Sequence, residues 1–272
     1  MDVDDVLQTY LDEQIAAAEN VDASYGVLWW YIKAMVLGGG KRLRPKIMVQ
    51  TYIKYGGCEL NRIVPVAAAW EMLHVGLLIH DDIMDGDLVR RGQPTIEAIY
   101  NDRGVAILAG DLCLGAANDL VLNSGLSNYL KLKTLQLLQD IYKEVMGGQL
   151  LDIDSRRHDP LKVAEHKTAS YTFVGPMVCG AMLAGASGKK LEKIRATAIN
   201  LGVAFQLQND VEDFEQDLAA GRHSAVIQAM DDLGSLAEAK IAIQQLIITL
   251  AEREGFEPSM ELPPYRLSKA AH

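Results

Sequence analysis

Apolar residues recur three and four positions apart along most of this chain, and strict alternation of apolar and polar residues is almost absent. That spacing places apolar side chains on one face of an α-helix, whereas alternation would indicate strands. The pattern therefore predicts an all-α protein. The predicted helices are 2–19, 24–37, 45–56, 61–85, 94–100, 103–123, 127–154, 160–185, 189–217 and 234–254.

Proline and glycine mark several of these helix boundaries. Pro45, Pro94 and Pro160 each suit a first helical position, where the backbone N–H that proline lacks is not needed. The glycines at 38–40 are suited to end the second helix. No repeat or linker interrupts the pattern, so residues 1–272 are expected to form a single-domain helical bundle, with 255–272 as a loosely ordered tail.

The composition narrows the class of protein. Hydrophobic residues make up 49% and charged residues 23% of the chain, which is typical of a folded soluble domain. Lys and Arg number 26 against 36 Asp and Glu, which gives a net charge of −10. Non-specific nucleic-acid binding depends on a basic surface. We therefore expect no nucleic-acid partner.

Three features favour a cytoplasmic location. The cysteines Cys58, Cys113 and Cys179 are scattered and form neither a disulfide framework nor a zinc motif, as is typical of a reducing compartment. The first residues are acidic, whereas a signal peptide begins with basic residues. The Gly- and Ala-rich uncharged run 174–188 is shorter than the roughly 20 residues of a spanning helix. We expect no stable membrane insertion.

A dense group of ionisable residues ends the predicted helix 61–85. On a helix, Asp81 and Asp85 lie about 40° apart, and His74, two turns earlier, lies about 20° from Asp81. Carboxylates one turn apart repel each other, and a divalent cation relieves that repulsion. Carboxylate oxygens with retained waters are typical of Mg²⁺ sites. The alternative interpretation is a solvated acidic helix end.

A second group of oxygen-bearing side chains follows much later in the chain. Asn209 and Asp213 are four positions apart, and Asp210 and Asp213 are three apart, so their oxygens share one helix face. Two such acidic helix ends favour carboxylates that face one another across a cavity, as in the multi-metal sites of helical bundles.

Basic residues beside glycines predict an anion site. Residues 38–45 (GGGKRLRP) place Lys41 and Arg44 close to a helix N-terminus, whose N–H groups and dipole also attract anions. The spacing of a Walker loop is absent, and so is a dinucleotide-binding glycine motif. A second basic group comprises Arg90, Arg91, Lys167 and Thr168. Together with two acidic clusters, these residues indicate a metal-bound diphosphate.

The order of the motifs resembles the trans-isoprenyl diphosphate synthase (polyprenyl synthetase) family, and its geranylgeranyl diphosphate synthases in particular. The motifs are GGGKRLRP, HVGLLIHDDIMD with RRG, GD at 110–111, GGQLLD at 147–152, KTASYT at 167–172 and FQLQNDVED. The resemblance covers roughly residues 36–226 and implies an all-α bundle around a deep central cavity, usually a homodimer. It also implies Mg²⁺-dependent condensation of isopentenyl diphosphate with an allylic diphosphate.

The resemblance implies a role for each matching residue. It assigns two or three Mg²⁺ ions to Asp81, Asp82, Asp85, Asn209, Asp210 and Asp213. It assigns isopentenyl diphosphate to Lys41, Arg44, His74 and Arg91, and the allylic diphosphate to Arg90, Lys167 and Thr168. Phe205 and Gln206 would line the reacting pair, with Gln206 also binding substrate. The implied catalytic set is Asp81, Asp85, Lys167, Phe205 and Gln206.

Two departures from the family pattern keep alternatives open. Asn209 offers a neutral oxygen where the family normally has an aspartate, and Arg222 follows a shortened loop where a lysine is expected. The run Asn209-Asp210-x-x-Asp213-x-x-x-Asp217 is also near the metal motif of class I terpene cyclases, which share the fold and need no second anion site. A catalytically weak partner subunit and a peptide-modifying prenyltransferase are further alternatives.

Residues before the first aspartate predict the product length. Leu77 lies one turn, about 5.4 Å, below Asp81 on the same helix face. Leu73 lies one turn deeper, and Gly76 lies beside it. In the resembled family, aromatic residues four or five positions before the first aspartate close the cavity at short products. Leu77 and Gly76 occupy those positions here, which predicts a C20 product, geranylgeranyl diphosphate.

Overall fold

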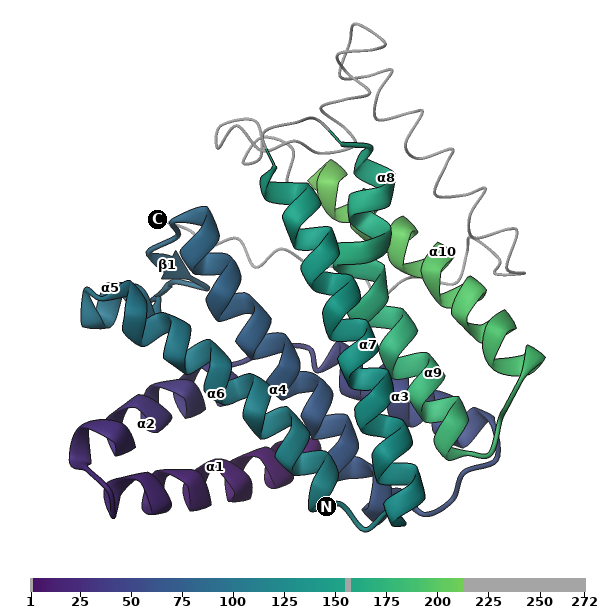
Figure 1. The fold of residues 1–272 in the computed structure, drawn as a ribbon, viewed down its shortest axis with the longest axis horizontal. Helices are drawn as coiled ribbons and strands as arrows, with labels where there is room; N and C mark the ends of the chain where they lie inside the picture. The colour runs from purple at the N-terminus through teal and green to yellow at the C-terminus, as the bar shows by residue number, and fades with distance from the viewer. Residues whose placement is uncertain (1, 155–157, 213–272) are drawn as a thin grey trace, which may run out of the picture.

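The computed structural model describes residues 2–154 and 158–212 (Figure 1). The expected helix 234–254 and the tail 255–272 lie outside this part, so the single-domain prediction stays a prediction. The helices are α1 (Val3–Glu19), α2 (Ala23–Leu37), α3 (Leu43–Lys54), α4 (Leu60–Asp85), α5 (Ile96–Tyr100), α6 (Arg103–Leu122), α7 (Asn128–Ile153), α8 (Pro160–Val163), the π-helix η1 (Ala164–Val174), α9 (Gly175–Leu183) and α10 (Lys189–Glu212). The all-α prediction is confirmed.

The largest difference from the predicted elements lies between α4 and α5. A short antiparallel hairpin forms there from β1 (Val89–Arg90) and β2 (Gln93–Pro94). Pro94 was expected to begin a helix, and this expectation was wrong. Helix α5 begins instead at Ile96, because Thr95 caps it by accepting a hydrogen bond from the backbone N–H of Ala98.

Two smaller differences concern proline positions. Pro160 is the first residue of α8, as expected. Pro45 is the third residue of α3 rather than the first, because the chain turns into the helix earlier, at Arg42. The backbone of Arg42 is left-handed, with φ of 50°.

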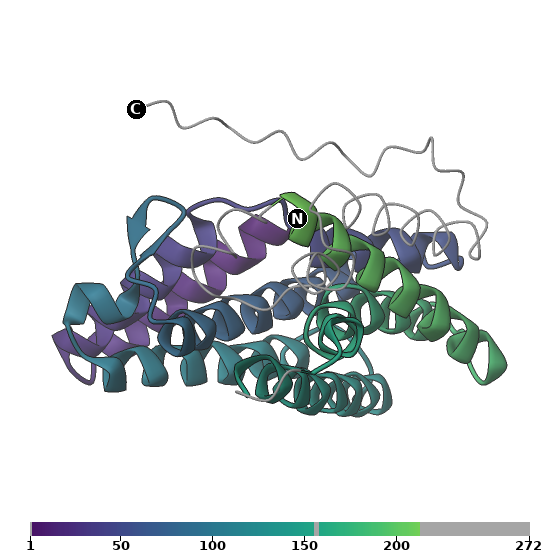
Figure 2. The ribbon, with the colours of Figure 1, turned by 90° about the horizontal axis from the view of Figure 1, so that it is seen from above.

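Helix α4 runs through the centre of the bundle, and its last turn carries the first acidic cluster (Figure 1). It packs against α6, α3 and α1. The α4–α6 contact is close because Gly76 has no side chain: a Cβ there would lie 3.0 Å from the Gly110 carbonyl oxygen. The α1–α2 hairpin and α10 lie toward opposite sides of the molecule (Figure 2).

By length and composition, α4 and α6 could each cross a membrane. From the sequence, only the run 174–188 was considered for this role. The apolar window of α4 is 78% buried inside the bundle, which is typical of a core helix. That of α6 is 44% buried. Part of the apolar surface of α6 therefore faces outward.

Candidate active site

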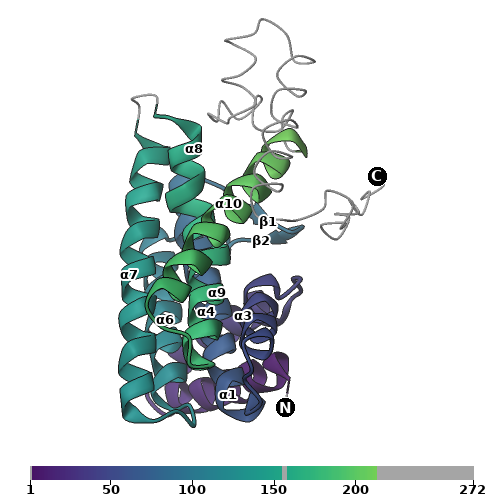
Figure 3. The same cartoon turned by 90° about the vertical axis from the view of Figure 1, so that its right-hand side faces the viewer.

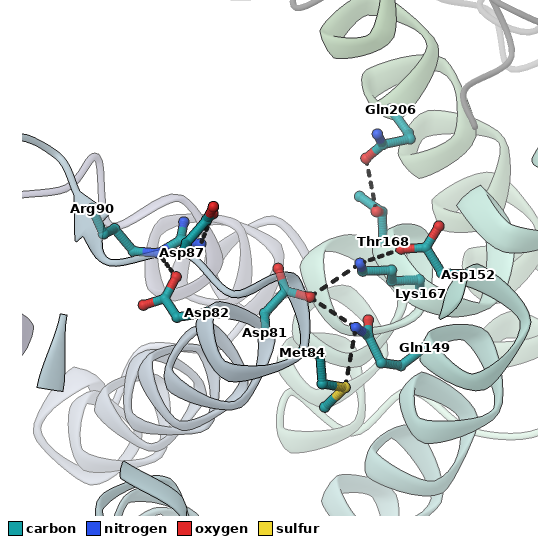
Figure 4. Close-up of polar contacts among 10 residues, drawn as sticks. All are labelled: Asp81, Asp82, Met84, Asp87, Arg90, Gln149, Asp152, Lys167, Thr168 and Gln206. Atoms are coloured by element: carbon teal, nitrogen blue, oxygen red, sulfur yellow. Dashed lines mark hydrogen bonds and ion pairs between the residues drawn. The ribbon is translucent and has the colours of Figure 1, made fainter. Parts of the chain in front are cut away.

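The last turn of α4 meets α7 and η1 at Asp81. Oδ1 of Asp81 accepts hydrogen bonds from Nζ of Lys167, at 3.2 Å, and from Nε2 of Gln149, at 2.9 Å (Figure 4). Lys167 also donates to Oδ2 of Asp152, at 2.5 Å. Burial lowers the pKa of Lys167, but the charges of Asp81 and Asp152 outweigh it, so the pKa is raised above its usual value. An ammonium group is thus held between two carboxylates.

The π-helix explains how Lys167 reaches this position. Helix η1 has 11 residues and packs against both α7 and α10. Figure 3 shows α7 along one edge of the molecule and α10 nearer its middle. Two glycines allow the backbone of η1 to approach both neighbours. A Cβ on Gly148 would lie 2.3 Å from the backbone nitrogen of Lys167, and one on Gly202 would lie 2.3 Å from Cβ of Ala169. π-Helical segments are frequent at functional sites.

The second acidic cluster is connected to the first through the residue after Lys167. Thr168 Oγ1 donates to Oε1 of Gln206, at 2.8 Å (Figure 4). Gln206 Nε2 in turn donates to Oδ1 of Asp210, at 2.7 Å. The side chain of Asp210 is buried and that of Asn209 is half-buried. Asp213 and the shortened loop with Arg222 lie outside the described residues.

The three carboxylates of the first motif have different surroundings. Asp82 is 3% exposed and forms an ion pair with Arg90. Burial raises its pKa to about 6, although the charge of Arg90 acts in the opposite direction. Asp85 is exposed at the end of α4. The structure thus places Asp81 against Lys167, Asp82 against Arg90, and Asp85 at the surface.

Arg44 lies inside the first turn of α3 and is buried. Its Nη2 donates to Oγ1 of Thr172, at 2.8 Å, and its guanidinium carbon lies 4.2 Å from the ring centroid of Tyr171. The ring of His74 lies 5.9 Å from that of Tyr171. Nε of Arg44 and Nδ1 of His74 are both buried without a hydrogen-bond partner among the described residues. A bound anion could accept a hydrogen bond from Arg44 Nε.

The surroundings of His74 are strongly positive. Its pKa is lowered well below the usual value by burial first, and then by Arg44, Arg91, Arg90 and Arg42. Several guanidinium groups therefore act on one imidazole. Like charges gathered this way favour the binding of an anion with several negative charges.

The hairpin and the glycine-rich loop are joined by Arg91. Its Nη1 donates to the carbonyl oxygen of Gly39, at 2.9 Å, and its own φ of 52° lies in the left-handed region. Lys41 is exposed on this loop. His74 and Arg91 line one cavity together with Gly39. Arg44 is joined to His74 through the ring of Tyr171.

A family model described as polyprenyl synthetase matches residues 28–226. The chain belongs to the polyprenyl synthetase family. It is 33% identical over 221 residues to a short chain isoprenyl diphosphate synthase of Methanocaldococcus jannaschii, a match that spans 79% of this chain and 63% of that relative. It is 29% identical to a geranylgeranyl diphosphate synthase of Methanosarcina mazei, over 82% of this chain and 76% of the relative.

The same family includes solved structures of similar fold. A geranylgeranyl pyrophosphate synthase from Corynebacterium glutamicum, complexed with isoprenyl diphosphate and magnesium, aligns with a TM-score of 0.82 and 27% identity. The alignment covers 93% of this chain and 90% of that one. The isoprenoid synthase fold is thereby confirmed.

The residues present fit a magnesium ion that is shared with a substrate of this family. No three histidine, cysteine or acidic side chains cluster tightly enough to hold a metal by themselves within 2–154 and 158–212. Mg²⁺ is usually bound by one or two carboxylates, by waters and by substrate phosphates, rather than by a complete protein cage. Asp81 and Asp85 could provide the carboxylates on α4, and Asp210 could provide one on α10.

A cavity of about 30 Å³ is lined by Asp81 and Lys167 together with several apolar side chains. Leu77, Met84 and Met146 are among its lining residues. Leu73 is 1% exposed and does not line this cavity, and Gly76 packs against α6. A prenyl chain would fit here only if lining side chains moved, and the flexible side chains of Met84 and Met146 allow such movement.

The structure adds Gln149 and Asp152 to the direct contacts of the site. In the sequence both belong to the GGQLLD motif at 147–152, to which the sequence analysis assigned no role. They are three positions apart on α7 and share a helix face, from which Gln149 donates to Asp81 and Asp152 accepts from Lys167. Phe205 on α10 packs against η1, with its ring 5.6 Å from that of Phe173.

Proposed function

We propose that this chain is a Mg²⁺-dependent prenyltransferase that condenses isopentenyl diphosphate with dimethylallyl, geranyl or farnesyl diphosphate to give a longer trans-prenyl diphosphate. The observation that carries this proposal is the position of Tyr171. Its ring contacts Arg44 and His74, and it also lines the cavity shared by Asp81 and Lys167. Tyr171 thus lies between the basic residues around Arg44 and the site around Lys167. A reaction of two diphosphates requires two such neighbouring cationic sites.

In this proposal the first cationic site holds the allylic diphosphate. Lys167, Arg90 and Thr168 bind the departing group and stabilise the negative charge that develops on it. Magnesium, two or three ions when bound through Asp81, Asp85 and the α10 carboxylates, supplies Lewis-acid stabilisation of the same charge. The ion pair between Arg90 and buried Asp82 holds the arginine in place.

The second site orients isopentenyl diphosphate. Arg44, Lys41 and Arg91 hold its diphosphate, while neutral His74 can donate or accept a hydrogen bond. Tyr171, which lies between the two sites, helps to keep water from the allylic cation, so that the isopentenyl double bond attacks it. Phe205 is proposed to line the reacting pair. A proton is then lost to regenerate a double bond, with the departing diphosphate as its acceptor.

We further propose a C20 product and a cytoplasmic location. Leu77 lies one helical turn before Asp81 and lines the same cavity. Relatives named for C20 synthesis, from Methanosarcina mazei and Sulfolobus acidocaldarius, support this product length.

A homodimer is the assembly that the surface favours. On α6, the exposed fractions of Ile107, Leu108 and Leu122 are 44%, 59% and 50%, and on α7 those of Tyr129 and Leu132 are 68% and 67%. Exposed apolar side chains on two helices that contact each other support an interface between subunits. Sedimentation equilibrium of the full chain should give twice the monomer mass of 29.8 kDa.

Incubation of the full chain with labelled isopentenyl diphosphate, each allylic primer and Mg²⁺ tests the proposed reaction. Incorporation of label into a longer prenyl diphosphate, abolished by a chelator, is expected. A terpene cyclase would instead release a hydrocarbon from a prenyl diphosphate without isopentenyl diphosphate. Absence of incorporation with all three primers would refute the condensation and favour a weak partner subunit.

A further inference from the structure

The guanidinium of Arg42 connects four parts of the chain. Nε donates to Asp4 on α1, at 2.6 Å, and Nη1 donates to Glu71 on α4, at 2.9 Å. Nη2 donates to the carbonyl oxygen of Val36 near the end of α2, at 2.7 Å, and Nη1 approaches that of Gly39, at 3.4 Å. The side chain of Arg42 is only 10% exposed.

Glu71 is the buried partner in this network. Its side chain is 5% exposed, and its second carboxylate oxygen, Oε2, has no hydrogen-bond partner among the described residues. It lies one turn before His74 on α4. Both residues line a cavity of about 240 Å³ whose wall also includes Gly39 and Arg91. A negative charge therefore lies beside the proposed site for an anion.

Arg42 also determines the shape of the glycine-rich loop. Its left-handed backbone, with φ of 50°, follows Gly39 and Gly40, whose φ values are 120° and 130°. Such a run is strained for residues other than glycine. The contacts of the Arg42 side chain with Val36, Gly39 and Glu71 hold the loop in this conformation. Lys41 and Arg44 flank Arg42 and take their positions from it.

We propose that the Arg42–Glu71 ion pair positions residues 38–44 for isopentenyl diphosphate, so that Glu71, despite its negative charge, strengthens the binding of this anion. The inference rests on the proposed function for the identity of the ligand. Neither residue is placed in contact with the diphosphate. Both are positioning residues that act through Lys41 and Arg44.

The direction in which Glu71→Gln changes the affinity for isopentenyl diphosphate distinguishes this positioning role from a purely electrostatic effect. Glu71→Gln removes a negative charge near the anion site while keeping the size of the side chain. By charge alone, binding of isopentenyl diphosphate should become tighter. If Glu71 positions the loop through Arg42, binding should become weaker, because Arg42 loses its buried charged partner.

We would measure the Kd of isopentenyl diphosphate by calorimetry for the wild-type chain, Glu71→Gln and Arg42→Lys. Weakening of about tenfold, equivalent to about 1.4 kcal/mol, is expected for each variant. In the condensation assay, KM for isopentenyl diphosphate should rise while kcat and KM for the allylic substrate stay within about twofold of wild type. Arg62→Ala, in an exposed ion pair with Glu59, is the control and should leave all values unchanged.

Unchanged or tighter binding of isopentenyl diphosphate by Glu71→Gln would overturn the inference. If circular dichroism shows that Glu71→Gln does not fold, Arg42→Lys is judged by the same criterion. A wild-type chain that binds isopentenyl diphosphate but forms no condensed product would refute the proposed function alone. In that case the binding comparison still decides the role of Glu71.

Discussion

The side-chain nitrogen of Lys167 lies 3.2 Å from Oδ1 of Asp81, which joins η1 to the last turn of α4. The same ammonium group contacts Asp152 on α7. One cation therefore partly neutralises two carboxylates where the account places magnesium and an allylic diphosphate. This relationship links the acidic motif of α4 to the basic motif of η1.

Replacing Lys167 tests whether this cation stabilises the departing diphosphate. Lys167→Gln should lower kcat by about 10²–10³, since it removes a preformed electrostatic group from the reacting centre. Initial rates with the allylic substrate measure this effect. Lys143→Gln, which changes an exposed lysine on α7, is the control. Equal rates for wild type and Lys167→Gln would exclude a catalytic role.

A pair of neighbouring glycines tests the close packing of η1. A Cβ on Gly148 would lie 2.3 Å from the Lys167 backbone, whereas one on Gly147 meets nothing within 4 Å. Gly148→Ala should lower the free energy of unfolding by about 1–3 kcal/mol, because η1 must move. Gly147→Ala should raise it by up to about 1 kcal/mol through helix propensity. Denaturant unfolding measures both, and equal effects would contradict the packing.

The lowered pKa of His74 predicts how the free energy of unfolding changes with pH. Its pKa is lowered in the folded chain, so it stays neutral where the unfolded chain, with a pKa of about 6.5, takes up a proton. The stability contributed by this group is therefore present above about pH 6.5 and decreases as the pH falls below that value. His74→Gln should show a smaller decrease between about pH 7 and pH 5.

NMR titration of His74 provides the direct measurement. Without ligand, its pKa should be well below the usual value for histidine, and adding isopentenyl diphosphate should raise it, because an anion offsets the surrounding arginines. An unperturbed pKa in the free protein would show that the arginines do not converge on this ring.

We expect the side chain of Leu77 to limit the length of the prenyl product. Leu77→Phe fills the cavity that Leu77 and Asp81 line and should shorten the main product from C20 toward C15. Chromatography of the dephosphorylated products gives the chain length. Leu73 and Gly76, which were also expected to set the length, lie away from this small cavity. An unchanged product from Leu77→Phe would assign the limit to another helix.

The helical part of the fold could be predicted because its signals are local. The apolar run of α4 ends in polar residues and Gly86, whose left-handed backbone caps the helix, so its end at Asp85 follows from the sequence. The hairpin could not be predicted, because its strands have two residues each and show no alternation. Its turn uses Arg91 and Gly92, both with positive φ, rather than the usual Asn-Gly pair.

The residues of the site could be predicted from the sequence, but the contacts between them could not. Spacing placed Asp81 and Asp85 on one helix face, but it could not show that Asp82 turns inward to Arg90. The π-helix was missed because its hydrogen bonds do not follow the 3.6-residue period that apolar spacing reports. The contact between Thr168 and Gln206 depends on how η1 packs against α10, which no local pattern encodes.

The central claim is that the acidic ends of α4 and α10 bind one diphosphate through magnesium. A crystal structure of the full chain with Mg²⁺ and a non-hydrolysable allylic diphosphate analogue tests it most directly. The account predicts magnesium between the analogue and Asp81, with Asp210 or a neighbour on α10 facing the same diphosphate and Lys167 in contact with it. A diphosphate bound elsewhere, with neither helix end contributing a carboxylate, would contradict the account.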